Sequence, residues 1–296
     1  MIVLDSHIVQ VDDNIRFVDY AIGMFPGFET RNAIKKGIKK NRFLINGEKA
    51  KTGTWVKNDD RIDLLERSEK PKVYNKEIEV VFEDDYLAVV HKPAGLIVSG
   101  NQFKTLENCL IDRVKCSKAE DALEWALPVH RLDAPTSGLV IFAKTISSRR
   151  RLGEMLANKG ILKMYHAVVH GIPKESWINQ PIDGKVASSN LKVIQSVPSL
   201  KNEHLSLIQL EPITGRTHQL RIHCQYIGNS IVGDQKYVSD QGTFKHKGLF
   251  LSATQVLFQH PITNEKVNVE IPVPAKFFSL LQREARRVEK FNSNES

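Results

Sequence analysis

The feature that most constrains the fold is a series of short segments rich in β-branched and aromatic residues, separated by Gly, Pro and Asn turns. The series begins near Ile78 and continues to about Pro274, with an early turn at Asp84-Asp85 and only a few helical patterns between the segments. This arrangement predicts an α+β fold with a largely antiparallel mixed sheet flanked by helices and loops. The expected strands include residues 78–82, 86–90, 139–143, 165–170, 205–210 and 266–271, and the expected helices include residues 106–113, 147–158 and 219–227.

A charged segment that contains Pro71 separates this region from a smaller N-terminal part. The large domain is expected to finish with an amphipathic helix over residues 277–290, after which the chain frays. The predicted organisation is a small independent unit at residues 1–66, a linker at 67–77, the large domain at 78–290 and a tail at 291–296.

The small unit is predicted to begin with two helices. Phe17, Tyr20 and Ala21 are apolar at helical spacing, and Phe25-Pro26-Gly27 ends that helix. Thr30 is the expected N-cap of a second helix over residues 31–40, in which Ile34 and Ile38 share one face. After it, Asn46-Gly47 tolerates the positive φ angles of a tight turn, so residues 43–50 are predicted to form a hairpin, and residues 61–65 a last strand.

The second helix carries five cations and no carboxylate, namely Arg31, Lys35, Lys36, Lys39 and Lys40. Such runs are more often solvated helix faces than binding sites. The sequence of helix, basic helix and hairpin resembles the S-four-type RNA-binding domain, named after a small-subunit ribosomal protein. That module opens on Arg-Leu-Asp, whereas this chain has Arg16-Phe17-Val18-Asp19. The resemblance implies RNA contacts from Arg31, Lys35, Lys36 and Lys39.

Composition favours an anionic partner. The chain has 42 Lys and Arg against 34 Asp and Glu, for a net charge of +8, which suits a phosphate backbone, although the same excess can serve solubility alone. Cys109, Cys116 and Cys224 form neither a disulfide framework nor a Cys-x-x-Cys metal site. No signal peptide is evident after Met1, and no apolar run approaches the ~20 residues of a membrane helix. These features predict a cytoplasmic protein.

The segment at residues 127–139 is the strongest candidate for chemistry. Pro128 and Pro135 restrict the backbone around Arg131 and Asp133. A carboxylate on a restrained loop beside a cation suits either a structural ion pair or a nucleophile, and spacing alone leaves both open. Nucleotide-triphosphate chemistry is disfavoured, because no Gly-x-Gly occurs, and a P-loop-like spacing of Gly95 and Gly100 lacks the Lys and Ser or Thr that must follow it.

Four stretches then share one family pattern in the correct order. Residues 130–139 match His-Arg-Leu-Asp-x-x-Thr-Ser-Gly-Leu, residues 92–96 match a strand-end motif, residues 163–171 match Lys-x-Tyr-x-Ala, and residues 214–223 with 233–237 match a third signature. Together they resemble the RluA-type family of RNA pseudouridine synthases over residues 79–274. One departure is Ala134-Pro135, where many relatives have polar residues. The resemblance implies a pseudouridine synthase catalytic domain at residues 78–290.

The resemblance also implies roles for individual residues. Asp133 would supply the essential carboxylate, which either attacks the anomeric carbon of ribose or removes the 2′ proton. Tyr165 would stack on uracil, with help from its hydroxyl in moving the proton from C5 as a second implied role. Arg221 would pair with Asp133 and keep it charged and oriented. Arg131 would fill the stack that the flipped base vacates. Arg216, the second choice as partner of Asp133, is placed nearer phosphate, and His130 is placed among the RNA contacts.

Pseudouridine formation is an isomerisation without redox change, so the resemblance implies no cofactor. His130, His218 and His223 lack the Cys or carboxylate spacing of a zinc site, so no metal is expected. The implied partner of a monomeric enzyme is structured RNA, with ribosomal RNA favoured over transfer RNA. The alternatives are a non-catalytic RNA-binding or ribosome-assembly protein that retains the fold, and a hydrolase that uses Asp133 but lacks a second carboxylate motif.

Overall fold

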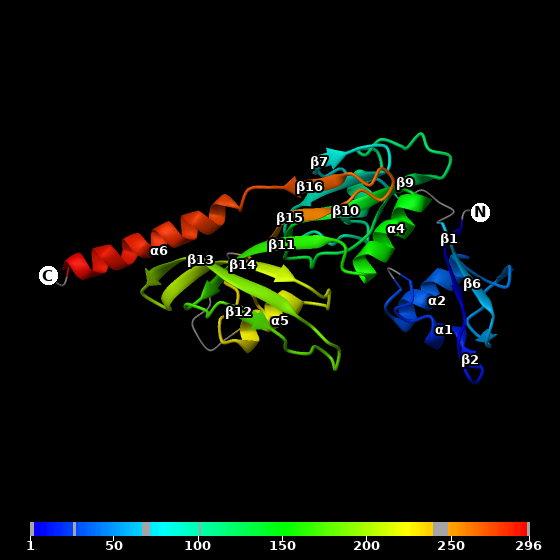
Figure 1. Ribbon diagram of the computed structural model, residues 1–296, viewed down its shortest axis with the longest axis horizontal. Helices are drawn as coiled ribbons and strands as arrows, with labels where there is room; N and C mark the ends of the chain where they lie inside the picture. The colour runs from blue at the N-terminus through cyan, green and yellow to red at the C-terminus, as the bar shows by residue number, and fades with distance from the viewer. Residues whose placement is uncertain (1–2, 26–27, 67–71, 101, 239–247, 295–296) are drawn as a thin grey trace.

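The structure is a computed structural model that describes residues 3–25, 28–66, 72–100, 102–238 and 248–294. Figure 1 shows a small N-terminal unit, a larger sheet domain beside it, and a C-terminal helix that extends away from the sheet. The larger part has the predicted α+β architecture. Among the described residues, no helix is long and apolar enough to cross a membrane.

The N-terminal unit contains a four-stranded antiparallel sheet in the order β1-β6-β3-β4, together with two helices and a two-stranded β2-β5 pair. Thr30 caps the second helix as predicted, because its side chain accepts a hydrogen bond from the Ala33 N–H at 3.1 Å. Asn46 and Gly47 have φ angles of 51° and 84° and form the predicted turn. The elements are β1 (Val3–Ile8), β2 (Ile15–Arg16), α1 (Phe17–Tyr20), α2 (Arg31–Lys39), β3 (Phe43–Ile45), β4 (Glu48–Lys49), β5 (Trp55–Val56) and β6 (Arg61–Leu65).

Strand β1 was not predicted from the sequence. Its centre, Asp5-Ser6-His7, is polar, so the segment lacks the alternation by which a strand is recognised. The strand forms because it pairs with β6, with Ile8 opposite Arg61 and Val3 opposite Leu65, a partnership that no local pattern reveals. The expected helix break at Pro26-Gly27 and the linker proline Pro71 lie outside the described residues.

The large domain is built on a ten-stranded sheet whose main path runs β12-β13-β14-β11-β15-β10-β8-β7, with β16 on β15 and β9 on β10. Among the described strand pairs, β10 with β15 is parallel and the rest are antiparallel, as the sequence predicted. The elements are β7 (Glu79–Glu83), β8 (Leu87–Lys92), α3 (Leu106–Leu110), β9 (Ala122–Pro128), β10 (Ser137–Thr145), α4 (Ile146–Ala157), β11 (Leu162–His170), β12 (Ser176–Ile178), β13 (Ser189–Ser199), β14 (Glu203–Pro212), α5 (Gln219–Tyr226), β15 (Leu251–Gln259), β16 (Lys266–Glu270) and α6 (Ala275–Asn294).

The central strands are buried on both faces. On β10, Val140 and Phe142 belong to one hydrophobic cluster, whereas Leu139 and Ile141 belong to another that also contains Leu152 of α4. This division follows from the two-residue period of a strand, which sends successive side chains to opposite faces. Burial on both sides holds the middle of the sheet rigid, and the loop that carries Asp133 leads directly into β10.

The two units share a hydrophobic core. Trp125 and Leu127 on β9 and Ile111 after α3 are buried in the same cluster as Phe17 and Phe43 of the N-terminal unit. The sequence predicted an independent unit, but apolar contacts between units far apart in the chain cannot be read from local periodicity. The shared core therefore holds the N-terminal unit, with α2, against the large domain.

The C-terminal helix is longer than predicted. It runs from Ala275 to Asn294, so residues 291–294, expected to be a frayed tail, are helical, and residues 295–296 lie outside the described ranges. Phe277, Leu280 and Leu281 anchor its first half in the main core. The second half, residues 285–294, continues the helix with side chains that are exposed or only partly buried.

Gly138 allows β10 and β15 to approach closely. Its φ is +120°, and an added Cβ would overlap the backbone of Ala253 on β15. Gly138→Ala is expected to destabilise the protein by at least about 2 kcal/mol, from strain and overpacking, in urea unfolding. Gly153→Ala is the control, because Gly153 is exposed on α4 with nothing near its Cβ position, so a gain of about 0.5–1 kcal/mol is expected. Equal stability of the two variants would contradict the close approach.

Candidate active site

The loop that carries Asp133 connects β9 to β10 and is held by backbone hydrogen bonds. The Asp133 carbonyl accepts from the Thr136 N–H at 3.1 Å, and the Ala134 carbonyl accepts from the Gly95 N–H at 2.7 Å. Lys92, at the end of β8, has no exposed surface, and its Nζ donates to the carbonyls of Pro93, Leu96 and Ala134 at 3.1, 2.7 and 3.1 Å. The ammonium therefore ties the strand-end motif to the Asp133 loop.

The charge on Lys92 reflects two opposing influences. Burial lowers the pKa of Lys92 to about 8, and the negative charge of Asp133 opposes that shift. The three carbonyl acceptors match the three N–H donors of an ammonium group, so at neutral pH Lys92 is a cation beside the carboxylate. It acts on Asp133 through the loop backbone, as a positioning residue.

Arg221 on α5 lies between two carboxylates. Its Nε and Nη2 donate to the two oxygens of Asp234 at 2.7 and 2.8 Å, which forms a bidentate pair. The remaining Nη1 donates to Asp133 Oδ2 at 3.3 Å. The side chain of Arg221 is 8% exposed, against 19% for Asp133. Asp234 fixes the plane of the guanidinium, and the guanidinium in turn orients the Asp133 carboxylate.

Asp234 is itself held by the turn that contains it. Burial raises the pKa of Asp234, but hydrogen bonds from Arg221 and from the N–H groups of Tyr237 and Lys236 outweigh burial, so the pKa is lowered overall. The Tyr237 ring covers Arg221 at 5.1 Å from its guanidinium carbon, and the Tyr237 hydroxyl lies 2.9 Å from His218 Nδ1. The anion, the cation and the aromatic ring thus form one packed unit.

His218 stands on the other side of the Asp133 carboxylate. Its Nε2 is 3.7 Å from Asp133 Oδ1, and its backbone is left-handed, with φ 57°, at the N-cap of α5. Burial lowers the pKa of His218, and this outweighs the opposing effect of Asp133. The neighbouring Gln219 closes the loop before α5, because its side-chain oxygen accepts from the Thr214 hydroxyl at 2.6 Å and the Arg216 N–H at 3.0 Å.

Tyr165 reaches the site through strand register. On β11 it lies opposite Ala253 of β15, which in turn pairs with Gly138, just after the Asp133 loop. Neighbouring strands are about 4.8 Å apart, so this register brings Tyr165 to the loop across two strand spacings. Tyr165 is 8% exposed, and burial together with the charge of Asp133 raises the pKa of its phenol far above the ordinary value. The phenol is protonated throughout the neutral range.

Asp133, Tyr165 and Arg221 line one cavity of about 660 Å³, so the structure brings the three expected catalytic residues together. Arg131 and Arg216 are exposed at its wall, and Arg216 Nε donates to the Val186 carbonyl at 3.0 Å. The lining cations outnumber the lining carboxylates: they are Arg131, Lys159, Lys163, Arg216 and Arg221, against Asp133 and Glu211. This balance suits an anionic substrate. The expected N-terminal contacts Arg31, Lys35, Lys36 and Lys39 do not line this cavity.

His130 has a structural contact. Its Nε2 accepts a hydrogen bond from the Ile141 N–H at 3.1 Å, so the ring supports the middle of β10. Burial and, to a smaller extent, the nearby charge of Lys163 together lower the pKa of His130 to about 3. The neutral ring borders the cavity, where an RNA contact from it stays a prediction.

Sequence reasoning assigned no role to three residues of this site, Lys92, His218 and Asp234. All three lie inside the stretches that matched the family pattern, and this position in the motifs was the sequence signal that could have marked them as site residues. Their roles depend on contacts with residues far away in the chain, which spacing does not show. Among the described residues, no group of His, Cys, Asp and Glu could hold a metal ion.

Comparisons with known proteins agree with this geometry. The sequence profile of the RNA pseudouridylate synthase family matches residues 86–226. An uncharacterized RNA pseudouridine synthase of Chlorobaculum parvum is 31% identical, over 86% of this chain and 89% of the relative. Ribosomal large subunit pseudouridine synthase C of Vibrio parahaemolyticus is 30% identical, over 83% of this chain and 82% of the relative. Human RNA pseudouridylate synthase domain containing 4 shares the fold, with a TM-score of 0.56 and 24% identity over 70% of this chain and 92% of that one.

The chain belongs to the RluA-type family of RNA pseudouridine synthases, and its activity is that of an isomerase acting on RNA.

Asp234→Asn tests whether the bidentate pair positions Arg221. The substitution keeps the size of the side chain but removes the charge-assisted bonds, so Arg221 loses its fixed orientation. A charge-assisted bond contributes about 1.5–3 kcal/mol, so kcat is expected to fall about 10- to 100-fold. Single-turnover measurement of pseudouridine formation checks this value, and an unchanged kcat would show that Arg221 needs no help from Asp234.

His130→Gln tests the neutral ring through pH-dependent stability. The folded-state pKa lies below that of the unfolded chain, so the unfolded state binds the extra proton and stability falls as the pH drops from about 6.5 towards 3. Gln supplies an oxygen acceptor for the Ile141 N–H without titrating. Urea unfolding between pH 7 and 4.5 should therefore show a steeper loss in the natural protein than in the variant, and parallel curves would refute a neutral His130.

Proposed function

We propose that this protein converts specific uridines of structured RNA to pseudouridine, with Asp133 as the nucleophile and after the target base has been flipped out of its stack. The observation that carries the proposal is the Asp133 carboxylate, held by Arg221 at 3.3 Å inside a cavity of about 660 Å³ with cations on its wall. That volume lies in the range of small-ligand sites and suits a single extruded nucleotide.

Asp133 breaks the bond between uracil N1 and ribose C1′. The carboxylate either attacks C1′ directly or removes the 2′ proton to leave a glycal, and the electron pair of the broken bond goes to the uracil. The base then rotates and bonds to C1′ through C5. On the first route the C1′–O bond to Asp133 breaks as the C5–C1′ bond forms, and on the glycal route C2′ takes its proton back. C5 then loses its proton to a basic group of the site or to water, and N1 gains a proton. Atoms and electrons balance without a cofactor, and both routes need one fixed carboxylate, which Arg221 and the Lys92-bound loop supply.

We assign stacking on the uracil to Tyr165. The ring is buried in the cavity wall beside Asp133, and its raised pKa keeps the hydroxyl protonated. The flat face of the ring is what it offers the base as the base turns, and its hydroxyl is the group of Tyr165 that could help to move the C5 proton.

Arg131 and Arg216 are assigned to the RNA backbone and to the vacated stack. Arg131 is exposed two residues before Asp133, close enough to the emptied position to fill it while the base occupies the cavity. Arg216 has one bond to the Val186 carbonyl through Nε, which leaves its terminal nitrogens for phosphate.

Ribosomal RNA is the proposed substrate, with transfer RNA as the alternative. The support is the relatives that are ribosomal large subunit pseudouridine synthases and the basic, S-four-type helix of the N-terminal unit. The proposal includes a monomer that works in the cytoplasm, in keeping with three free cysteines, Cys109, Cys116 and Cys224.

Asp133→Asn is expected to reduce pseudouridine formation below detection, because the amide can neither attack C1′ nor accept the 2′ proton, while the Kd for RNA changes by less than about threefold. Pseudouridine mapping in total RNA from cells with and without the gene identifies the site to assay. Glu211→Gln removes the same charge from the same cavity and should retain activity within several-fold. Turnover by Asp133→Asn at the natural rate would refute the mechanism, and RNA binding without any isomerisation by the natural protein would favour a non-catalytic binder.

A further inference from the structure

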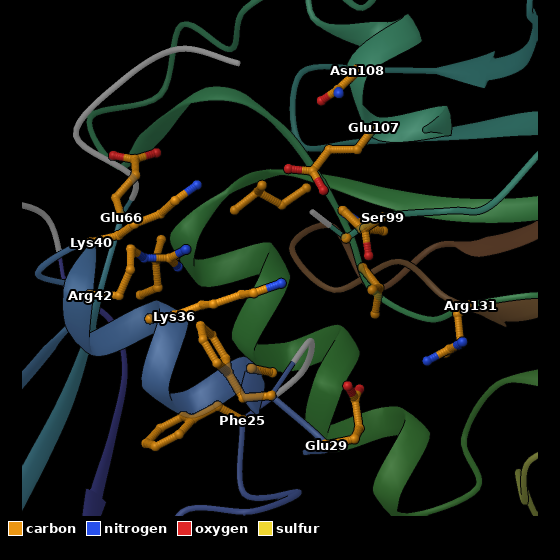
Figure 2. A pocket seen from close by; sticks show the side chains of 18 of the residues that line it. Phe25, Glu29, Lys36, Lys40, Arg42, Glu66, Ser99, Glu107, Asn108 and Arg131 are labelled. Carbon is orange, nitrogen blue, oxygen red and sulfur yellow. The ribbon is translucent and has the colours of Figure 1, made fainter. Parts of the chain in front are cut away.

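A second and larger cavity, of about 900 Å³, lies between the N-terminal unit and the catalytic domain. Figure 2 shows Lys36 and Lys40 entering it from α2, with Ser99, Glu107 and Arg131 on the catalytic side. The two units share a core beside it, so the cavity is a fixed part of the architecture.

The structure sorts the cations of α2 into two sets. Lys36 and Lys40, one turn apart, line the cavity, whereas Lys35 and Lys39 do not. With 3.6 residues per turn, the second pair lies about 100° around the helix axis from the first. Arg31 forms an ion pair with Asp19 at 3.2 Å. Sequence alone grouped these cations together, and their directions follow only from how α2 packs.

The charges within the cavity do not cancel. Its lining includes six cations, Lys36, Lys40, Arg42, Lys72, Arg131 and Arg149, and three carboxylates, Glu29, Glu66 and Glu107. Arg149 is partly buried close to the charges of Asp5, Glu107 and Glu66, so its charge is offset by these carboxylates. Among the described residues, Lys36 and Lys40 form no ion pair and are exposed. A net positive potential therefore faces the opening.

The cavity adjoins the candidate active site. His130 and Arg131 line both cavities, and Asp133 lies two residues after Arg131. Lys36 lines the larger cavity together with Arg131, so an RNA strand that passes Arg131 has a cationic surface beside it. A small anion would need only one of these places, whereas a polymer with regularly spaced phosphates can occupy both.

We propose that this interdomain cleft binds the phosphate backbone of the RNA strand that adjoins the flipped uridine, with Lys36 and Lys40 contacting phosphates. The proposal departs from the family resemblance at Lys35 and Lys39, which point away from the cleft lining and remain in solvent. The inference rests on the proposed function. It gives the N-terminal unit a definite role, because α2 forms the second wall of the RNA path. The hydrophobic core that the two units share then sets the distance between the target uridine and the phosphates bound by Lys36 and Lys40.

The test compares Lys36→Ala/Lys40→Ala with Lys35→Ala/Lys39→Ala. All four residues are exposed on the same helix, and each double variant lowers the net charge from +8 to +6, so bulk electrostatics are matched. The probe is deproteinised ribosomal RNA from cells that lack the protein. Each phosphate contact contributes about 0.7–0.9 to the slope of log K against log salt. The Lys36/Lys40 variant should therefore lose about 1.5 from that slope and raise KM about tenfold with kcat unchanged, and the Lys35/Lys39 variant should change neither.

An unchanged slope and KM in the Lys36/Lys40 variant would overturn the inference, as would equal effects in the two variants, which would indicate charge alone. If the natural protein forms no pseudouridine, the proposed function fails, yet the salt slopes still report whether the cleft binds RNA. The two failures are thus distinguishable. Thermal unfolding of both variants checks that neither substitution has altered the fold.

Discussion

The site depends on one buried guanidinium shared by two carboxylates. Arg221 uses two donors for Asp234 and a third for Asp133, so its pairing with Asp234 sets the orientation of the Asp133 carboxylate. Breaking a buried pair on one side leaves an uncompensated charge, which is far more costly than losing a surface ion pair. The arrangement therefore resists distortion when RNA binds, and the Tyr237 ring packs against the Arg221 guanidinium.

A second cation, Lys92, serves the backbone of the same loop. Two of its three carbonyl acceptors, Pro93 and Leu96, follow β8, and the third, Ala134, precedes β10. Burial makes each of these hydrogen bonds strong. The parallel pairing of β10 with β15 then fixes where the loop ends, because Gly138 lets the two backbones meet. Arg221 of α5 thus sets the orientation of the Asp133 side chain, whereas the sheet sets the position of the loop that carries Asp133.

The catalytic cavity and the interdomain cleft meet at Arg131. Under the proposed function, a uridine that leaves its stack stays covalently joined to its strand, so the surface next to the cavity accepts backbone while the cavity accepts the base. The observed surface there is cationic and belongs partly to the N-terminal unit. This arrangement gives a physical reason for a shared hydrophobic joint between units that a flexible linker could otherwise have connected.

The sequence by itself determined the elements whose causes are local. The Thr30 cap, the Asn46-Gly47 turn and the strand and helix periods appear where predicted, because caps, turns and alternation depend on neighbouring residues. The ordered motifs also identified the family and placed Asp133, Tyr165 and Arg221 among the candidate residues. The extent of the C-terminal helix was underestimated, because its last residues, Phe291-Asn292-Ser293-Asn294, include three residues of modest helix propensity that give no local sign of continuing a helix.

Only the tertiary structure decided what depends on contacts between distant residues. Strand β1 exists through its pairing with β6, Asp234 matters because Arg221 folds onto it, and Lys92 matters because three carbonyls surround it. The separation of Lys36 from Lys35 likewise follows from which face of α2 packs against Phe28 and Phe43. Residue type and spacing fix which groups a chain can offer, but their distances and directions arise from packing, which the order of residues along the chain does not display.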